Sequence, residues 1–424
     1  MSKLEKYSSY KDSGVEWLGE IPSEWEILPS KRFHINLKEL NTRRNCSNVL
    51  SLTLRGVVNN NLDSPEGLVP KDYATYQIFE KNDLVFKLID LENISTSRVG
   101  LVHEKGIMSS AYIRIQLEKD SLSKYAYYYY FNLYLNQVYN NLGSGVRSTL
   151  GPTDLLNIEY TKPSYSEQIK IASFLDTKTE QLDIAIKQKE HLIELLKERR
   201  QILINDAVTK GIDKTVAMKD SGVEWIGEIP EHWEIVSGFT VYKENKTKNT
   251  GMKDDRVLSL SYGKIVVKPK EKLTGLVPES FETYQIVKPG DIIIRCMDLQ
   301  NDQTSLRTAI SVNDGIITSA YLNLNIIDAF NSNYLHYYLH SLDITKVLYK
   351  LGSGLRQNLS YWDFKRLPIV KPSKEKQQDI VEYIEKNNQK IDKAIDLQQQ
   401  QITKLKEYKT TLIDSVVTGK VKIS

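Results

Sequence analysis

The sequence predicts a mixed α/β protein in which two similar globular domains are joined by two long helices. We expect the helices to form an antiparallel coiled coil about an internal pseudo-twofold axis. Three observations support this: an internal duplication, short apolar runs between turn residues, and a heptad period after each copy. The 424 residues suffice for two or three domains. We place globular domains at 1–164 and 210–373, a central helix at 165–209, and a C-terminal helix with its tail at 374–424.

The amino-acid sequence contains an internal duplication. KDSGVEWLGEIPSEWEI at 11–27 recurs at 219–235 with 14 of 17 positions identical, at an offset of 208 residues. One extra residue near Leu306 changes the offset to 209, which relates Leu-Gly-Ser-Gly at 142–145 to the same letters at 351–354. The copies differ where 36–61 faces 241–266 and where 92–102 faces 300–312. This variation reflects either neutral drift of loops or two copies of one binding scaffold adapted to different targets.

Each copy contains signals for strands followed by a helix. Apolar runs predict buried strands at 83–87 and 107–115, and at 291–295 and 316–324 of the second copy. Tyr and Leu at helical spacing predict helices at 125–138 and 333–348. We expect the four tryptophans of the repeated opening segment to pack in the core or at its edge, because aromatic rings bury large areas. They are Trp17, Trp25, Trp225 and Trp233.

A long helix follows each globular domain. Neither proline nor glycine occurs from Ser166 to Thr209, and about 40 helical residues would form a rod of roughly 60 Å. Such a rod would hold two binding domains at a fixed separation. Positions recurring every seven residues predict the coiled-coil interface. These positions are Leu175, Leu182, Lys189, Leu196 and Leu203 in the first helix, and Ile384, Ile391, Gln398, Leu405 and Leu412 in the second.

Both heptad series lose their apolar residue at the same place, Lys189 in one helix and Gln398 in the other. Polar side chains inside such an interface can fix the register at some cost in stability. If the helices pair antiparallel, these layers lie near the middle, and replacing both with Leu should raise thermal stability while loosening register. A solvated break in the interface is the alternative interpretation.

Composition excludes several classes of function. The two cysteines, Cys46 and Cys296, give neither a disulfide framework nor, with the six histidines, a metal-ligand spacing. The sequence has no glycine loop ending in Lys-Ser/Thr for nucleotide phosphates and no Asn/Asp-Pro-Pro-aromatic tetrapeptide of amino methyltransferases. Without these motifs we expect a protein that is not itself an enzyme. With no membrane-length apolar run and no secretory signal, we expect it in the cytoplasm. A net charge of +3 does not by itself indicate nucleic-acid binding.

Taken together, these features resemble the specificity subunits of type I restriction–modification systems. The resemblance covers nearly the whole chain and rests on three duplicated motifs. They are the Asp12–Trp25 opening with its copy at 220–233, the Gly-Ser-Gly-x-Arg turns at 143–147 and 352–356, and Pro-Ser-x3-Gln before each helix, with Gln168 and Gln377. Each motif alone is weak, but their duplicated order is specific.

The resemblance implies two target-recognition domains, each reading one half of a bipartite sequence in double-stranded DNA. It also implies two methyltransferase subunits that flip and methylate an adenine in each half-site, and restriction subunits, powered by ATP, that can join. No cofactor is expected on this chain, since S-adenosylmethionine and ATP would bind to the partner subunits.

Basic residues at matching places are our first candidates for DNA contact, with variable polar residues as candidates for reading bases. Matching arginines suit phosphate, because the two halves would read different bases. The candidates are Lys87, Arg98, Arg147, Arg295, Arg307 and Arg356, together with Asn93, Ser95, Asn301 and Gln303. The alternative interpretation makes them solvated loop residues or members of internal ion pairs.

Three other functions stay open at this stage. The chain could serve a methyltransferase–nuclease of another architecture, which only the partner sequence would distinguish. It could be a coiled-coil scaffold with two protein-binding domains, a reading that the near-neutral charge keeps open. An autonomous DNA enzyme would need catalytic motifs that the sequence does not contain.

Overall fold

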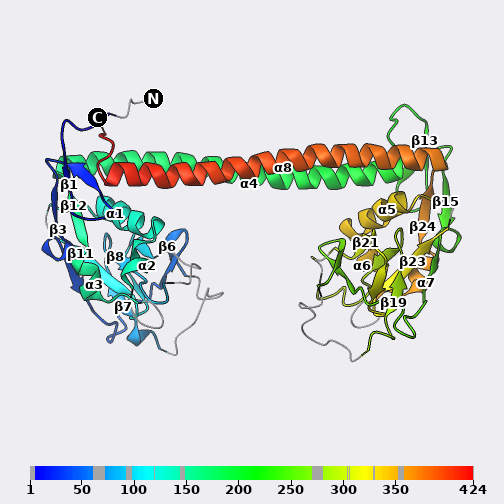
Figure 1. The fold of residues 1–424 in the computed structure, drawn as a ribbon, viewed down its shortest axis with the longest axis horizontal. Coiled ribbons are helices and arrows are strands. Elements are labelled where there is room, and N and C mark those ends of the chain that lie inside the picture. The colour runs from blue at the N-terminus through cyan, green and yellow to red at the C-terminus, as the bar shows by residue number, and fades with distance from the viewer. Residues whose placement is uncertain are drawn as a thin grey trace. The chain divides into compact units, whose positions relative to one another are not determined.

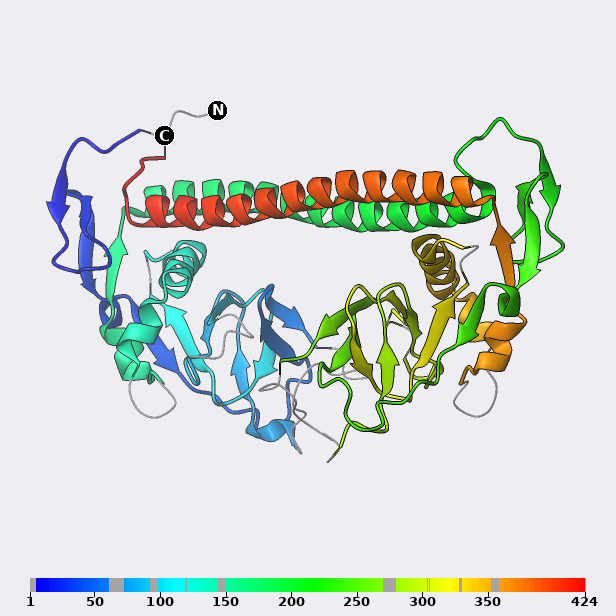
Figure 2. The ribbon, with the colours of Figure 1, turned by 45° about the vertical axis from the view of Figure 1, so that its right-hand side comes forward.

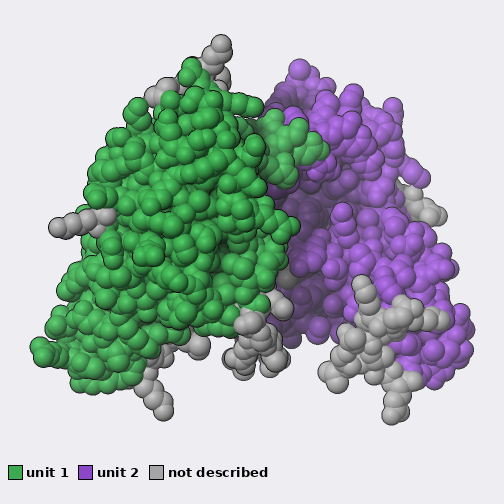
Figure 3. All heavy atoms as spheres, turned by 60° about the vertical axis from the view of Figure 1, so that its left-hand side comes forward, with its two compact units in different colours: residues 1–189, 400–424 green, residues 190–399 purple. Residues whose placement is uncertain are grey.

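A computed structural model describes residues 5–60, 72–91, 98–118, 120–143, 149–269, 280–302, 304, 306–327, 330–351 and 358–423. The chain forms two compact units, shown in separate colours in Figure 3. Unit 1 comprises residues 1–189 and 400–424, and unit 2 comprises residues 190–399. The division cuts both long helices, so each unit holds half of each. The domain boundaries drawn from chain order stay predictions. Within the described part, no helix is both long and apolar enough to cross a membrane.

The elements of unit 1 follow one another as short strands and then helices (Figure 1). The strands are β1 (Tyr10–Asp12), β2 (Glu20–Pro22), β3 (Glu26–Pro29), β4 (His34–Leu37), β5 (Leu50–Thr53), β6 (Gly56–Asn59), β7 (Gln77–Phe79), β8 (Leu84–Phe86), β9 (Val99–Leu101), β10 (Gly106–Met108), β11 (Ile113–Leu117) and β12 (Glu159–Lys162). The helices are η1 (Ser30–Arg32), η2 (Tyr73–Thr75), α1 (Ser123–Leu135), α2 (Val138–Leu142), α3 (Pro152–Asn157) and the long α4 (Tyr165–Lys210).

Unit 2 repeats this order of elements. Its strands are β13 (Met218–Asp220), β14 (Glu228–Pro230), β15 (Glu234–Ser237), β16 (Tyr242–Glu244), β17 (Leu258–Ser261), β18 (Lys264–Val267), β19 (Gln285–Val287), β20 (Ile292–Ile294), β21 (Thr308–Ile310), β22 (Gly315–Ile317), β23 (Leu322–Ile326) and β24 (Pro368–Lys371). Its helices are η3 (Gly238–Thr240), α5 (Ser332–Ile344), α6 (Val347–Leu351), α7 (Tyr361–Lys365) and the long α8 (Lys374–Val417). The mixed α/β fold class predicted from the sequence is confirmed.

The central sheet of each unit is antiparallel and has the same strand order. It runs β4-β11-β8-β9 in unit 1 and β16-β23-β20-β21 in unit 2. The pairs β5-β6, β7-β10 and β3-β12 have counterparts in β17-β18, β19-β22 and β15-β24. The sequence stretches expected as single strands at 107–115 and 316–324 are two strands each, because a turn between them sends the chain from a two-stranded pair into the central sheet.

The helices expected at 125–138 and 333–348 are also divided. Gln137 separates α1 from α2 with φ of +56°, and Lys346 separates α5 from α6 with φ of +63°. These residues are equivalent under the 209-residue offset. A left-handed residue cannot continue a right-handed helix, so each copy turns at the same point.

The main core of each unit lies between its central sheet and its helices. In Figure 2, α1 and α5 each lie between the sheet of their own unit and the long helices. In unit 1 the core includes Tyr125 and Tyr129 of α1 and, from the far end of α8, Ile413 and Val416. In unit 2 the matching core includes Tyr334 of α5 and the final turn of α4, where Ala207 and Val208 are buried. Each globular domain is therefore completed by the end of a helix that belongs to the other repeat.

Tyr125 and Tyr334 hold those helix ends in place through their hydroxyl groups. The Tyr125 hydroxyl donates to the carbonyl oxygen of Thr161 at 3.0 Å and lies 3.4 Å from that of Val417. The Tyr334 hydroxyl lies 3.0 Å from the carbonyl oxygen of Val370 and 3.1 Å from that of Val208. A buried phenol that lies on two carbonyl oxygens satisfies polar groups that burial would otherwise leave unpaired.

The long helices run antiparallel within each unit. In unit 1, Lys409 of α8 donates to Asp183 of α4, and Lys189 donates to Gln401. In unit 2, Arg200 of α4 pairs with Asp392 of α8. Residue numbers therefore fall on one helix as they rise on the other, which confirms the predicted antiparallel coiled coil. Each predicted interface position is buried or half-buried in its own unit, including Leu175 and Ile384, which are fully buried. The polar side chain of Lys189 is accommodated by a hydrogen bond to Gln401.

The duplicated glutamines explain the Pro-Ser-x3-Gln motif. Gln168 is buried at the start of α4, where its amide donates to the Pro163 carbonyl and accepts from the main-chain nitrogen of Leu122. Gln377 makes the same two contacts at the start of α8, with Pro372 and Asn331. The side chain ties the first turn of each long helix to the residue just before α1 or α5.

Candidate nucleic-acid interface

A hairpin with a fixed base projects from each unit. In unit 1 it is β5-β6, and in unit 2 it is β17-β18. Leu50 and Leu52 anchor the first hairpin in a small separate core, and Leu258 and Ile265 anchor the second. The hairpins lie largely within 36–61 and 241–266, two segments that share little besides Val-Leu-Ser-Leu at 49–52 and 257–260, and their anchors match.

A repeated glycine allows the base of each hairpin to approach the rest of the unit. A Cβ on Gly106 would lie 2.6 Å from Cγ of Leu50 and 2.9 Å from the carbonyl oxygen of Asn48. A Cβ on Gly315 would lie 2.6 Å from the Arg256 carbonyl oxygen and 2.8 Å from Cγ of Leu258. Only glycine fits such a close approach of main chain. The scaffold under the hairpins is therefore the same in both copies.

The hairpin tips differ. In unit 1, Thr53 faces Gly56, and the turn between them is formed by Leu54 and Arg55. In unit 2, Ser261 faces Lys264, and the turn is formed by Tyr262 and Gly263. Leu54 is 62% exposed and Tyr262 is 93% exposed. Each tip thus presents an exposed apolar side chain beside an exposed cation, Arg55 or Lys264.

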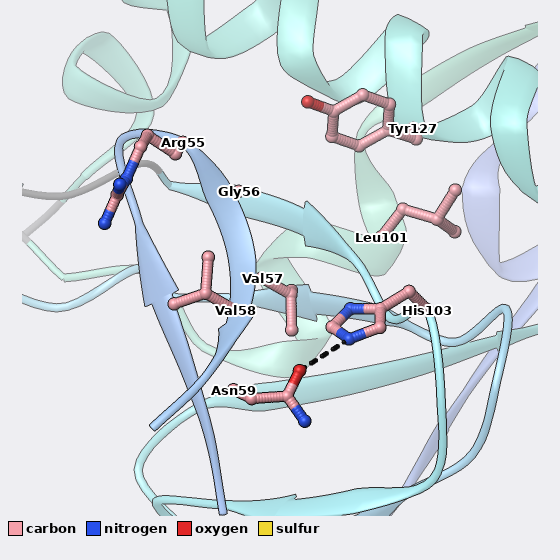
Figure 4. A pocket seen from close by; sticks show the side chains of 8 residues that line it. All are labelled: Arg55, Gly56, Val57, Val58, Asn59, Leu101, His103 and Tyr127. Atoms are coloured by element: carbon pink, nitrogen blue, oxygen red, sulfur yellow. Dashed lines mark hydrogen bonds between the residues drawn. The ribbon is translucent and has the colours of Figure 1, made fainter. Parts of the chain in front are cut away.

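In unit 1 the second divergent segment packs beside the hairpin. Figure 4 shows an open hollow of about 530 Å³ lined by β6, by Leu101 and His103 at and after β9, and by Tyr127 of α1. Asn59 and His103 point toward one another across it, with 2.9 Å between Oδ1 and Nε2. Arg55 points away from the hollow.

In unit 2 the same two segments meet, with different chemistry. A Cβ on Gly263 would lie 2.9 Å from Cδ1 of Leu306, so the hairpin tip rests on the loop that carries the extra residue of the second copy. The positions equivalent to Asn59 and His103 are Val267 and Val312, which are 44% and 73% exposed. A hydrogen-bonded polar pair in unit 1 is thus replaced by two exposed valines.

We refer to these surfaces as the divergent face of each unit. The divergent face of unit 1 consists of Leu54, Arg55, Asn59, Leu101 and His103. That of unit 2 consists of Tyr262, Lys264, Val267, Leu306 and Val312. Both are partly or largely exposed, rest on matching anchors, and carry side chains of different chemistry. Cations contact phosphate, amide and imidazole groups read base edges, and exposed apolar groups contact thymine methyls.

Arg98 and Arg307, expected at the DNA, are buried instead. Arg98 is 2% exposed and donates to the carbonyl oxygens of Ile89 and Asp90. Arg307 is fully buried and donates to four main-chain carbonyls, with the Tyr349 ring beside it. The tight turns at Asp90 and Asp298, which have positive φ, direct carbonyls inward, and a guanidinium group satisfies several at once. Both guanidinium groups therefore lie inside the fold.

The other DNA-contact candidates have varied positions. Lys87 is half-buried at the end of β8, and Arg295 at the end of β20 forms an ion pair with Asp302 at 3.0 Å. Asn301 is exposed, and its amide donates to Asp298 at 2.7 Å. DNA contact by these three stays a prediction. Five candidates lie outside the described residues, namely Asn93, Ser95, Arg147, Gln303 and Arg356.

The hairpin tips were missed by sequence reasoning. Tyr-Gly between the alternating run Leu-Ser-Leu-Ser and the β-branched run Ile-Val-Val is the signal that could have located the second hairpin. The first hairpin has Leu-Arg at its turn, which carries no comparable signal.

Among the described residues, no group of three or more His, Cys, Asp or Glu side chains could hold a metal ion. Burial raises the pKa of Cys296 to about 12 and lowers that of His34 to about 3, so both are neutral near pH 7.

Fold and site together define a class of protein: a duplicated, two-unit binding protein whose copies share a scaffold and differ on one face. Residues 55–195 match the family described as the type I restriction modification DNA specificity domain. The type I restriction enzyme MjaVIII specificity subunit of Methanocaldococcus jannaschii is 24% identical over 371 residues, covering 82% of this chain and 80% of its own. The putative MjaX specificity subunit of the same organism is 21% identical, with 96% of each chain covered.

Solved structures have the same fold. One, described as showing complex assembly and conformational transition of the type I R-M system, superposes with a TM-score of 0.67 at 13% identity, over 94% of this chain and 98% of that one. The HsdS subunit from Thermoanaerobacter tengcongensis superposes with a TM-score of 0.50 at 14% identity and the same coverage. The chain is thus similar over most of its length to specificity subunits of type I restriction–modification systems, which bears out the resemblance seen in its sequence.

Proposed function

We propose that this chain reads a bipartite double-stranded DNA sequence, one half with each divergent face, and performs no chemistry itself. It directs two partner methyltransferase subunits to an adenine in each half-site. Restriction subunits join the same complex when DNA is to be cut. The partners supply S-adenosylmethionine and ATP, and the complex acts in the cytoplasm.

One observation carries the proposal: matching scaffold contacts support two hairpins whose exposed side chains differ between the copies. Gly106 and Gly315 admit the hairpins in the same way, and Gln168 and Gln377 fix the long helices through the same contacts. By contrast, the second copy has Val267 and Val312 at the positions equivalent to Asn59 and His103. Binding residues concentrate on loops held by a rigid scaffold, and this favours adaptation of the two hairpins to different targets.

The chemistry of the two divergent faces favours different half-sites. Asn59 and His103 carry donors and acceptors that can address base edges in a groove, where an amide pairs best with adenine. Val267 and Val312 can contact thymine methyl groups. Arg55 and Lys264 are placed for phosphate contacts, which position a protein on DNA without reading sequence.

The test is a map of adenine methylation across the genome, in cells with and without this gene, with the partner methyltransferase present. A bipartite motif that disappears with the gene supports the proposal. An unchanged map, with the methyltransferase shown to be active, contradicts it and favours a coiled-coil scaffold with two protein-binding domains instead. Purification of the native complex identifies the partners and distinguishes a type I assembly from another methyltransferase–nuclease architecture.

An exchange within the chain makes the test sharper. Residues 30–160 are replaced by residues 238–369, which are their counterparts under the repeat. The chain would then carry two copies of the second divergent face. We expect the methylated motif to become symmetrical, with the second half-site present twice, while the original first half-site is no longer methylated. Retention of the first half-site would show that it is read outside residues 30–160.

A further inference from the structure

The turn at the tip of the second hairpin contains a residue that its backbone does not favour. With Ser261 opposite Lys264, the turn has two residues, Tyr262 with φ of +48° and Gly263 with φ of +71°. Two positive φ values are typical of a type I′ turn, which favours Asn or Asp before Gly. Gly263 meets this preference. Tyr262 does not, because a bulky side chain in the left-handed region crowds its own carbonyl oxygen.

The strain at Tyr262 is not imposed by the scaffold. The first hairpin has the same register, with Thr53 opposite Gly56, and its turn residues Leu54 and Arg55 avoid positive φ. The positive φ of unit 1 falls instead on Gly56, where it costs little. An unstrained turn is therefore available to this fold, and the second copy does not use it.

No contact within the described part of the chain compensates for the strain. The Tyr262 side chain is 93% exposed, the largest exposed fraction among the large apolar side chains of the described residues. The turn beneath it is well supported, because Gly263 lies against Leu306, and Ile265 is buried among Val287 and Ile293. A firmly held base thus presents an aromatic ring to the surroundings, which reduces the entropy lost when that ring binds.

The neighbours of the ring indicate what it binds. Lys264 and Lys268 are exposed on the same hairpin, as are Val266 and Val267. A flat apolar ring beside cations suits a nucleic acid, in which stacked bases lie next to phosphates. Apolar side chains inserted at a base step partly unstack it, and aromatic rings stack on exposed bases.

We propose that Tyr262 contacts the stacked bases of the second half-site and wedges its ring at one base-pair step. This inference rests on the proposed function, since it names a contact of the same divergent face. The strained backbone aims the ring outward, and the binding of DNA offsets the strain. Unit 1 has Leu54 at its tip, a smaller apolar group without a ring to stack.

The experiment uses Tyr262→Asn, Tyr262→Phe and a control, Phe239→Asn, which removes another exposed aromatic ring of unit 2 (51% exposed). Each full-length variant is purified with its methyltransferase subunits. The probe is a duplex carrying the motif that the wild-type complex methylates. Asn suits the left-handed turn, so Tyr262→Asn should raise the Tm of the chain and weaken binding roughly tenfold or more. Tyr262→Phe should bind within about threefold of wild type, and Phe239→Asn should bind as wild type does.

The opposite movement of stability and affinity distinguishes this role from a structural one, which would lower both. Duplexes with 2-aminopurine at successive positions locate the wedge, because unstacking brightens the probe at one step of the second half-site. Wild-type affinity in Tyr262→Asn overturns the inference and leaves the proposed function standing. Wild-type DNA affinity with loss of the methyltransferase subunits would make the ring a protein contact and also overturn it. A wild-type complex with no sequence preference would instead refute the proposed function.

Discussion

The ammonium group of Lys409 lies 2.7 Å from each carboxylate oxygen of Asp183, across the antiparallel helices of unit 1. In unit 2, Arg200 pairs with Asp392. The 209-residue offset relates Asp183 to Asp392 and Arg200 to Lys409. The two ion pairs are thus equivalent under the repeat. In unit 1 the cation comes from α8 and the carboxylate from α4, and in unit 2 the cation comes from α4 and the carboxylate from α8.

This repeated pair should respond to charge exchange. Asp183→Lys places two cations together and should lower stability by about 1 kcal/mol, as expected for a partly exposed pair. Adding Lys409→Asp should restore most of the loss, because the antiparallel register brings the same positions together again. Thermal unfolding of the single and double variants measures this. No recovery in the double variant would contradict the register, and Arg200 with Asp392 gives the matched experiment in unit 2.

A buried ion pair in unit 1 predicts a pH dependence. Arg114 donates to Asp83 at 2.6 Å, and their side chains are 4% and 2% exposed. Burial raises the pKa of Asp83 despite the neighbouring guanidinium group. Removing one partner of such a pair leaves a buried charge, so Arg114→Met should cost about 3–5 kcal/mol at pH 8.

The sign of the pH effect follows from that raised pKa. Asp83 holds its proton more tightly in the folded state, so its favourable contribution is present below the unfolded pKa and is lost as pH rises through the folded one. Removing Arg114 raises the folded pKa further. The stability deficit of Arg114→Met should therefore shrink between pH 8 and pH 5, as urea unfolding at each pH would reveal. A deficit that grows toward pH 5 would contradict this assignment.

The two motif glutamines predict equal losses in the two units. Gln168→Leu leaves the Leu122 N–H and the Pro163 carbonyl without their partner, and Gln377→Leu does the same to Asn331 and Pro372. A buried unsatisfied polar group costs about 1–3 kcal/mol. Hydrogen exchange of the first turns of α4 and α8 should show faster exchange at the altered helix only. A loss confined to one of the two variants would mean that the repeat has diverged in energetics.

The glycines under the hairpins predict a functional loss restricted to one half-site. Gly106→Ala forces Leu50 or the Asn48 carbonyl to move and should displace the first hairpin, since the added Cβ has no space. Methylation mapping should then show relaxed preference in the first half-site and an intact second one, with Gly315→Ala giving the reverse. Gly151→Ala is the control, because its Cβ would meet nothing closer than 3.5 Å. Equal relaxation of both half-sites by Gly106→Ala would count against independent reading.

The sequence predicted the duplication, the α/β class and the paired helices, because these depend on periodic signals that extend over many residues. Local turns were harder to predict from the sequence. Gln137 and Lys346 break helices without proline or glycine, since the tertiary packing of α2 and α6 stabilises a left-handed residue that the sequence does not announce.

The candidate site was only partly accessible from sequence. Arginines between strands indicated DNA contact, yet Arg98 and Arg307 satisfy carbonyls inside a turn, a role that depends on main-chain directions and not on residue type. Val-Leu-Ser-Leu recurs at 49–52 and 257–260 and marks the first strand of each hairpin, but the turns at 53–56 and 261–264 share no residue at matching positions and give no repeated signal.

The core of unit 1 takes its last members, Leu412 to Val417, from beyond unit 2 along the chain, whereas unit 2 is one uninterrupted stretch, residues 190–399. Residues 412–417, which complete the core of unit 1, are therefore translated after all of residues 190–399, which form unit 2. The repeat that is translated first is thus the one whose set of core residues is completed later in translation. Until residues 412–417 have been made, the core of the first globular domain is incomplete, and the apolar side chains that they would cover stay exposed.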